Sequence, residues 1–105
     1  MSSKIALHVK LTAAEGKGDE LVAAFSQLYP GPLDAEPGTE MHVIHQATDN
    51  PDVIFFYELY TDEAAYQAHS AGEALMSVVP KLGGLIGGPP EMVMGTPRNA
   101  KGIKV

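Results

Sequence analysis

Apolar and polar side chains alternate along residues 4–12, where every second residue is apolar: Ile5, Leu7, Val9 and Leu11. This period of two predicts a strand with one buried face. The period changes over residues 19–29, where Leu21, Phe25 and Leu28 fall at i, i+4 and i+7. That spacing is typical of one apolar stripe on an amphipathic helix, and Pro30-Gly31-Pro32 predicts its end.

Two further strand patterns occupy residues 40–47 and 53–60, separated by the turn-forming residues 48–52. Five such residues between two β-rich segments predict a hairpin with a longer loop. The second run, VIFFYELY, is apolar on both faces until Glu58. We therefore expect both of its faces to be covered.

Helical signals return after this hairpin. At Thr61-Asp62-Glu63 a capping side chain precedes two acids, which predicts a helix that continues through residues 64–69. Ser70-Ala71-Gly72-Glu73 has the spacing of a capping box, which predicts a second helix nearly in series with the first. A Gly/Pro connector at 83–90 then leads to a last short strand at 91–96.

The element order is therefore β-α-β-β-α-β, with the second helix split. This order predicts an α+β, ferredoxin-like fold, in which four antiparallel strands carry helices on one face. We expect residues 1–105 to form one domain, with a core at about 4–96 and a C-terminal arm at 97–105.

The sheet face without helices needs a cover. Along residues 53–60, one face carries Val53, Phe55, Tyr57 and Leu59, and the other carries Ile54, Phe56, Glu58 and Tyr60. If helices cover one of these faces, the other is an exposed apolar patch that suits a second subunit. The pattern alone predicts a homodimer.

Composition narrows the classes of function. The chain has 105 residues and a net charge of −6, so it repels phosphates, and we expect neither nucleic acid nor a membrane surface as a partner. The absence of cysteine excludes disulfides, cysteine-ligated zinc, iron–sulfur clusters and thiol catalysis. The pattern shows no signal peptide and no long apolar stretch, so a cytoplasmic location is expected.

Four candidates for chemistry lie near the strand-to-helix turn at Thr61: Glu58, Tyr60, Tyr66 and His69. Glu58 interrupts an apolar strand, and a buried carboxylate must find a donor or raise its pKa. Tyr66 and His69 share one helix face. Two interpretations stay open. Either these residues line a pocket between sheet and helices, or Glu58 pairs with a basic side chain and the tyrosines belong to the core.

The histidines raise the question of a metal site. His42 and His45 are three residues apart on a predicted strand, so their rings point to opposite faces and cannot share one ion. We therefore expect no metal. The Gly-rich segment 83–88 lacks the Lys-Ser/Thr of a phosphate loop, which argues against nucleotide binding.

Three segments occur in a characteristic order: the first strand with Glu15-Gly16-Lys17, the turn Ala35-Glu36-Pro37-Gly38, and the block from Ile54 to Gly72. Over Ile5 to Thr96 the chain thereby resembles the antibiotic biosynthesis monooxygenase, or quinol monooxygenase-like, family. The resemblance implies a dimeric α+β barrel with a pocket between sheet and helices in each subunit. It also implies oxygenation of a polycyclic phenol or quinol by O2 without metal, flavin or haem.

Some positions match the sequence pattern of this family, and others depart from it. Ala65 to His69 matches the family's Ala-x-x-x-His helix, and Tyr66 matches a pocket tyrosine of its polyketide-oxidising branch. Tyr60 stands where many relatives have Trp, and Phe56 stands where the polyketide-oxidising members have Asn.

The resulting hypothesis is a cofactor-independent monooxygenase acting on a small aromatic substrate. His69 would be the general base, and Glu58 would orient it or stabilise its protonated form. Tyr60 and Tyr66 would hold the substrate ring, and Phe56 would supply an apolar wall. The missing Trp and Asn leave two alternatives: a non-catalytic aromatic-binding or stress-related dimer, and an isomerase that uses His69 and Glu58 for proton transfer.

Overall fold

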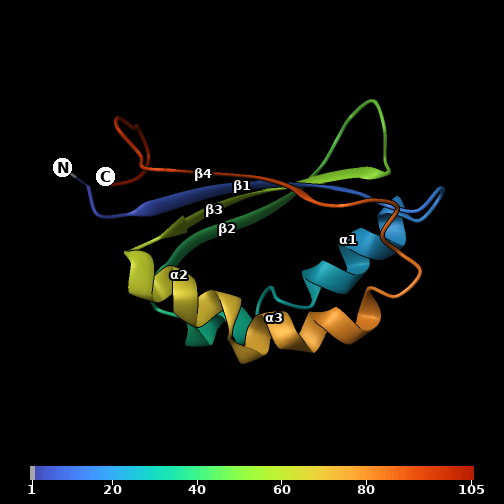
Figure 1. The fold of residues 1–105 in the computed structure, drawn as a ribbon, viewed down its shortest axis with the longest axis horizontal. Helices are drawn as coiled ribbons and strands as arrows, with labels where there is room; N and C mark the ends of the chain where they lie inside the picture. Colours follow the sequence, from blue (N-terminus) through green and yellow to red (C-terminus); the bar gives the residue numbers. More distant parts are fainter. Residues whose placement is uncertain (1) are drawn as a thin grey trace.

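The alternation of side chains along the strands places the helices on one face of a single sheet (Figure 1). The computed structural model describes residues 2–105. Its strands are β1 (Ile5–Thr12), β2 (Thr39–Gln46), β3 (Val53–Tyr60) and β4 (Glu91–Gly95). They pair antiparallel in the order β2-β3-β1-β4. The predicted α+β, ferredoxin-like fold is confirmed.

Three α-helices and two 3-10 turns connect these strands within residues 2–105. Helix α1 (Gly18–Ser26) follows β1, and α2 (Glu63–Ser70) and α3 (Glu73–Val78) follow β3, so the second helix is split as predicted. The 3-10 turns are η1 (Pro32–Ala35) and η2 (Val79–Lys81). None of the helices in this part of the chain is long and apolar enough to cross a bilayer.

The core lies between the helices and the inner face of the sheet. Its members that are almost fully shielded from solvent include Leu21 of α1, Leu28, Ile54 of β3 and Val78 of α3. The rings of Phe25 and Phe56 meet edge to face, with centroids 4.9 Å apart. Because α1, α3 and β3 all contribute, this cluster fixes the distance between the helix layer and the sheet.

The helix ends differ from the sequence prediction in three places. Helix α1 ends at Ser26, because the following amides of Leu28 and Tyr29 donate to carbonyls only three residues back and tighten the turn. Asp62, not Thr61, caps α2, since its carboxylate accepts the amide of Ala65 at 2.8 Å. The predicted capping box at 70–73 is wrong.

Ser70 is still the last residue of α2, and its hydroxyl donates to the carbonyl of Tyr66 at 3.0 Å. A side chain engaged with its own helix cannot cap the next one. The N-cap position of α3 is Gly72, which has no side chain to offer. The two helices are therefore separated by Ala71 and Gly72 alone.

The hairpin loop between β2 and β3 holds the start of α1. Asp52 accepts the amide of Gly16 and the amide of Gly18, each at 2.9 Å. A Cβ on Gly18 would lie 1.8 Å from the carbonyl oxygen of Pro51, so only glycine allows the loop to approach this closely. The carboxylate thus does the work of an N-cap from a distant part of the chain.

We predict that Asp52→Ala lowers the free energy of unfolding by about 1–2 kcal/mol, because two amides at a helix start lose their acceptor. Chemical denaturation at constant protein concentration measures this change. The matched control is Asp49→Ala in the same loop, where Asp49 is exposed and the effect should stay within about 0.5 kcal/mol. Equal effects of the two substitutions would contradict the capping role.

Candidate functional site

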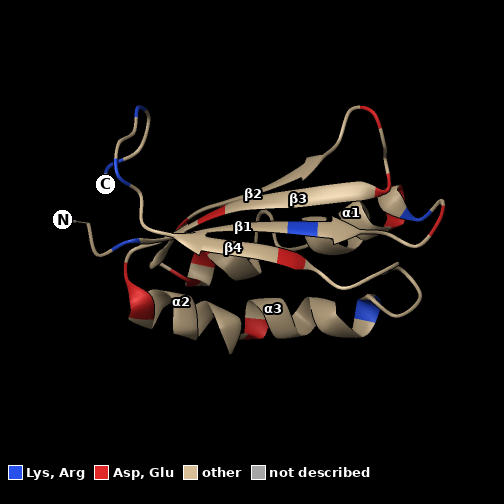
Figure 2. Ribbon diagram, turned by 45° about the horizontal axis from the view of Figure 1, so that its top comes forward, with Lys and Arg blue, Asp and Glu red and all other residues tan. Residues whose placement is uncertain are grey.

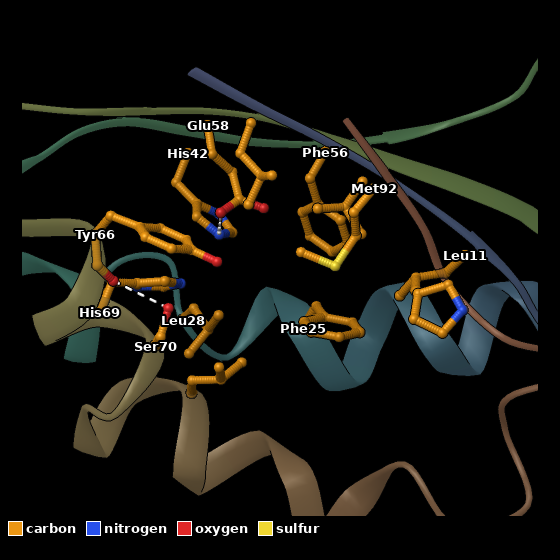
Figure 3. A pocket seen from close by; sticks show the side chains of 14 residues that line it. Leu11, Phe25, Leu28, His42, Phe56, Glu58, Tyr66, His69, Ser70 and Met92 are labelled. Carbon is orange, nitrogen blue, oxygen red and sulfur yellow. Dashed lines mark hydrogen bonds and ion pairs between the residues drawn. The ribbon is translucent and has the colours of Figure 1, made fainter. Parts of the chain in front are cut away.

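A cavity of about 290 Å³ lies between the inner face of the sheet and the helices (Figure 3). Four of the five predicted site residues line it: Phe56, Glu58, Tyr66 and His69. The structure thus brings together side chains from β3 and α2 that are close in sequence. Tyr60 does not line the cavity. It lies behind Glu58, fully buried, and donates its hydroxyl to that carboxylate.

The cavity has an apolar end and a polar end. Its apolar wall comes mainly from the sheet and α1, through Leu11, Phe25, Leu28, Phe56 and Met92. In Figure 3 the hydroxyl of Tyr66 points toward the opposite end, where Glu58 and His42 meet. A flat apolar molecule with one polar edge matches this division.

A carboxylate that the sequence analysis did not assign to the site orients His69. Glu36 Oε1 lies 2.7 Å from His69 Nδ1, and both side chains are largely shielded from water. An ionised carboxylate can only accept, so Nδ1 carries the proton and donates it to Glu36. This leaves the lone pair of His69 Nε2 free to accept a proton on the cavity side of the ring.

Two tight contacts position Glu36. A Cβ on Gly38 would come within 2.5 Å of the Cβ of Ala65 in α2, and a Cβ on Gly72 would come within 3.2 Å of Glu36 Oε2. Glycine at both positions lets the turn after η1 pack directly on α2. Thr39 also donates its hydroxyl to Glu36 Oε1 at 2.8 Å.

His42 is a further site residue that the sequence analysis missed. It lies opposite Glu58 across the β2–β3 pair, and its Nε2 is 3.6 Å from Glu58 Oε1. Its Nδ1 contacts the hydroxyl of Tyr29. Burial, together with the nearby His69, lowers the pKa of His42 to about 4. The contact with Glu58 is therefore not an ion pair at neutral pH.

Glu58 is buried, as its place in an apolar strand predicted. Burial raises its pKa, while the hydroxyl of Tyr60 and the nearby His69 act in the opposite direction. Burial and the adjacent Glu58 in turn raise the pKa of Tyr60 and of Tyr29. Both phenols therefore stay protonated and serve as hydrogen-bonding groups.

His42 and His45 point to opposite faces of the sheet, as their spacing predicted. His42 lines the cavity, whereas His45 stacks on Phe55 with ring centroids 4.6 Å apart. The period-two argument correctly separated the two rings but did not identify which one enters the site. The pairing of His42 with Glu58 shows that His42 is the histidine that enters the site. This pairing could not be predicted, because the register between strands is a property of the folded sheet.

Residues 4–79 match the family model described as antibiotic biosynthesis monooxygenase. The matched range includes every site residue described above except Met92. A search of curated proteins found no match.

Several solved structures share the fold along nearly the whole chain. The protein PA3566 from Pseudomonas aeruginosa is 22% identical, with a TM-score of 0.82, covering 94% of this chain and 98% of that one. NE2512 from Nitrosomonas europaea, described as a protein of unknown function, is 26% identical, with a TM-score of 0.81 and coverages of 93% and 92%. SnoaB, a cofactor-independent oxygenase from Streptomyces nogalater, is 17% identical, with a TM-score of 0.78 and coverages of 97% and 100%.

We predict that the low pKa of His42 makes the fold less stable in acid. As pH falls from about 6.5 toward 4, the unfolded chain binds a proton at His42 before the folded chain does, so unfolding becomes more favourable. By pH 4.5 this should cost about 2 kcal/mol relative to pH 7. His42→Gln should remove that part of the loss in denaturant titrations run in metal-free buffer.

The matched control for this measurement is His8→Gln, because His8 lies exposed on the opposite face of the sheet. It should keep the pH profile of the unsubstituted protein. If His42→Gln and the unsubstituted chain lose stability in parallel between pH 7 and pH 4.5, the assignment of the buried neutral imidazole is wrong.

Proposed function

We propose an oxygenase function from one premise: the chain belongs to the antibiotic biosynthesis monooxygenase family. Specifically, it oxidises an aromatic phenol or quinol with O2 and needs no organic cofactor for this step. The observation that carries the proposal is the His69–Glu36 pair, with the free nitrogen of His69 at the polar end of an apolar cavity. The oxygenase activity of SnoaB, a distant structural neighbour, supports the same reaction class.

His69 acts as the general base in this proposal. Its Nε2 takes the proton from the substrate hydroxyl, and Glu36 stabilises the imidazolium that forms. The phenolate is electron-rich enough to reduce O2. One oxygen atom enters the ring as the new carbonyl and the other leaves as water, so a phenol and one O2 give a quinone and one H2O. The substrate supplies all four electrons.

The apolar wall holds the substrate ring and keeps water from it. Phe25 and Phe56 present their rings to the cavity, and excluding water strengthens the interaction between the phenolate and the imidazolium. Tyr66 has its hydroxyl directed to the polar end, where it donates to the substrate oxygen. Glu58 lines that end and accepts the hydroxyl of Tyr60, which lies behind it, and this pair keeps the end polar.

We predict that His69→Gln lowers kcat by about 10²–10⁴-fold, because general base catalysis contributes an effect of this size. Glu36→Gln should lower it by at least about tenfold, since a neutral amide stabilises the imidazolium less well. Oxygen consumption with a panel of hydroquinones and anthrones in metal-free buffer measures both. Glu63→Gln on the exposed side of α2 is the control and should leave kcat unchanged.

The same assay can overturn the proposal. Absence of oxygen uptake with every substrate would exclude the oxygenase, and full activity of His69→Gln would exclude the assigned base. Turnover that continues at the same rate without oxygen would identify the isomerase alternative instead.

The helix-free face of the sheet is the surface through which we infer that two copies associate. It exposes Val43 (39%), Tyr57 (41%) and Val93 (70%). The strands in Figure 2 are mostly free of charge, and Lys10 and Glu91 pair with each other at 3.6 Å. An apolar surface of this kind suits burial against a second copy.

One polar atom on this face also fits a partner. His45 Nε2 is buried yet has no hydrogen-bond partner within residues 2–105. Such atoms are rare in native structures, and a second copy packed on the sheet would bring polar groups close to it.

We predict that Tyr57→Glu converts the dimer into monomers at micromolar concentration, because it places a charge in the centre of a desolvated surface. Sedimentation velocity measures the change in mass. The control is Met76→Glu, which adds the same charge at a residue of α3 that is also exposed (51%). A monomeric unsubstituted protein would contradict the inferred association.

A further inference from the structure

The polar end of the cavity gathers three side chains of the kinds that ligate metals. His42, Glu58 and His69 each offer one ligand atom, and these atoms all lie within 4.8 Å of one another. They come from three different elements, β2, β3 and α2. The spacing of His42 and His45 excludes a metal ion shared by those two residues. It says nothing about a site built from His42, Glu58 and His69, which are brought together only by the fold.

We propose that His42, Glu58 and His69 form a binding site for one divalent first-row transition metal ion. Two imidazoles and one carboxylate are the donor set of open zinc sites and of facial iron sites. The three side chains all line the cavity, so the fourth coordination position of an ion bound to them would face the cavity. The site is therefore of the open kind, in which a small molecule can approach the ion.

The distances fit an ion after small side-chain movements. Ligand atoms around a tetrahedral zinc ion are about 3.3–3.4 Å apart, as follows from bonds of about 2.0–2.1 Å. His42 Nε2 and Glu58 Oε1 are already 3.6 Å apart. The widest separation in the triad is within 4.8 Å, so a bound ion would have to draw the ligand atoms together by about 1.5 Å at most.

Each of the three ligands is held from behind by a second residue. Glu36 accepts from His69 Nδ1 at 2.7 Å, Tyr29 contacts His42 Nδ1, and Tyr60 donates to Glu58. Histidines that bind metals are almost always held in this way through their other ring nitrogen, and ligating carboxylates through a hydrogen-bond donor. The outer hydrogen bonds that would orient the ligands of a metal ion are therefore already in place.

Ion binding has a consequence for the reaction, a step that rests on the proposed function. The ion would occupy the lone pair of His69 Nε2, and this is the lone pair that takes the substrate proton. Metal binding and base catalysis therefore exclude each other. The ion acts as an inhibitor of the oxygenase.

The binding test uses Co²⁺, whose visible absorption reports its coordination, and Zn²⁺ in calorimetry. We expect one ion per chain, with Zn²⁺ displacing Co²⁺. His42→Ala and Glu58→Gln should each weaken metal binding by at least about tenfold, because the loss of an outer hydrogen-bond partner alone costs about 10–100-fold. His45→Gln is the matched control, because His45 belongs to the same His-x-x-His segment but faces away, and it should bind like the unsubstituted chain.

Glu58→Gln keeps the size of the side chain and an acceptor for Tyr60, so it tests the ligand role even if His42→Ala fails to fold. Circular dichroism of each variant checks folding. Absence of Co²⁺ absorption in the unsubstituted protein, or equal affinity in Glu58→Gln and His45→Gln, would overturn the site.

A separate measurement distinguishes this proposal from the proposed function. Saturating Zn²⁺ should abolish oxygen uptake by the unsubstituted chain, and a chelator should restore it. If the chain binds metal but consumes no oxygen, the metal-site proposal holds and the oxygenase proposal is excluded. If a bound ion instead increases oxygen uptake, this result contradicts both the inhibition by metal and the role of His69 Nε2 as the general base.

Discussion

The packing of one turn against one helix determines the chemistry of the cavity. The turn after η1 reaches α2 because Gly38 meets Ala65 without a side chain between them. This contact brings Glu36 to His69 at 2.7 Å and thereby decides which nitrogen of the imidazole carries the proton. Without it, His69 would be one more buried histidine with either tautomer available. The reactivity proposed for the site thus depends on two glycines, Gly38 and Gly72, that never contact the cavity.

The same contact explains why two separate sequence segments belong together. The Ala-Glu-Pro-Gly turn supplies the carboxylate, and the Ala-x-x-x-His helix supplies both the small surface and the imidazole. The small residue at 65 lies one helical turn before His69, so it shares a face with it. The two segments are complementary parts of one structure. A larger side chain at either small position would separate acid from base.

Much of the fold followed from periodicity, since a period of two or 3.6 depends on local geometry alone. The strands, the first helix and the burial of Glu58 were predicted in this way, whereas the hairpin was predicted from its turn residues and the split of the second helix from the capping box at 70–73. The capping box at 70–73 failed because Ser70 bonds to its own helix, which no local pattern reveals. Glu36 and His42 were not predicted as site residues, because their places depend on pairing register and on the approach of a distant turn. Tyr60, which stands where many relatives have Trp, was expected to hold the substrate ring, yet it supports Glu58 from behind and does not line the cavity.

The polar end of the cavity favours a cation in its centre. Glu58 and Glu36 place two carboxyl groups in a largely apolar interior, which costs free energy unless a positive charge or hydrogen-bond donors compensate it. Tyr60 and Thr39 compensate part of that cost through hydrogen bonds. A proton delivered by a substrate hydroxyl to His69 supplies positive charge, and so does a divalent ion among His42, Glu58 and His69. Both use the same lone pair, so the electrostatic arrangement that makes His69 a good base also makes the triad a good metal ligand.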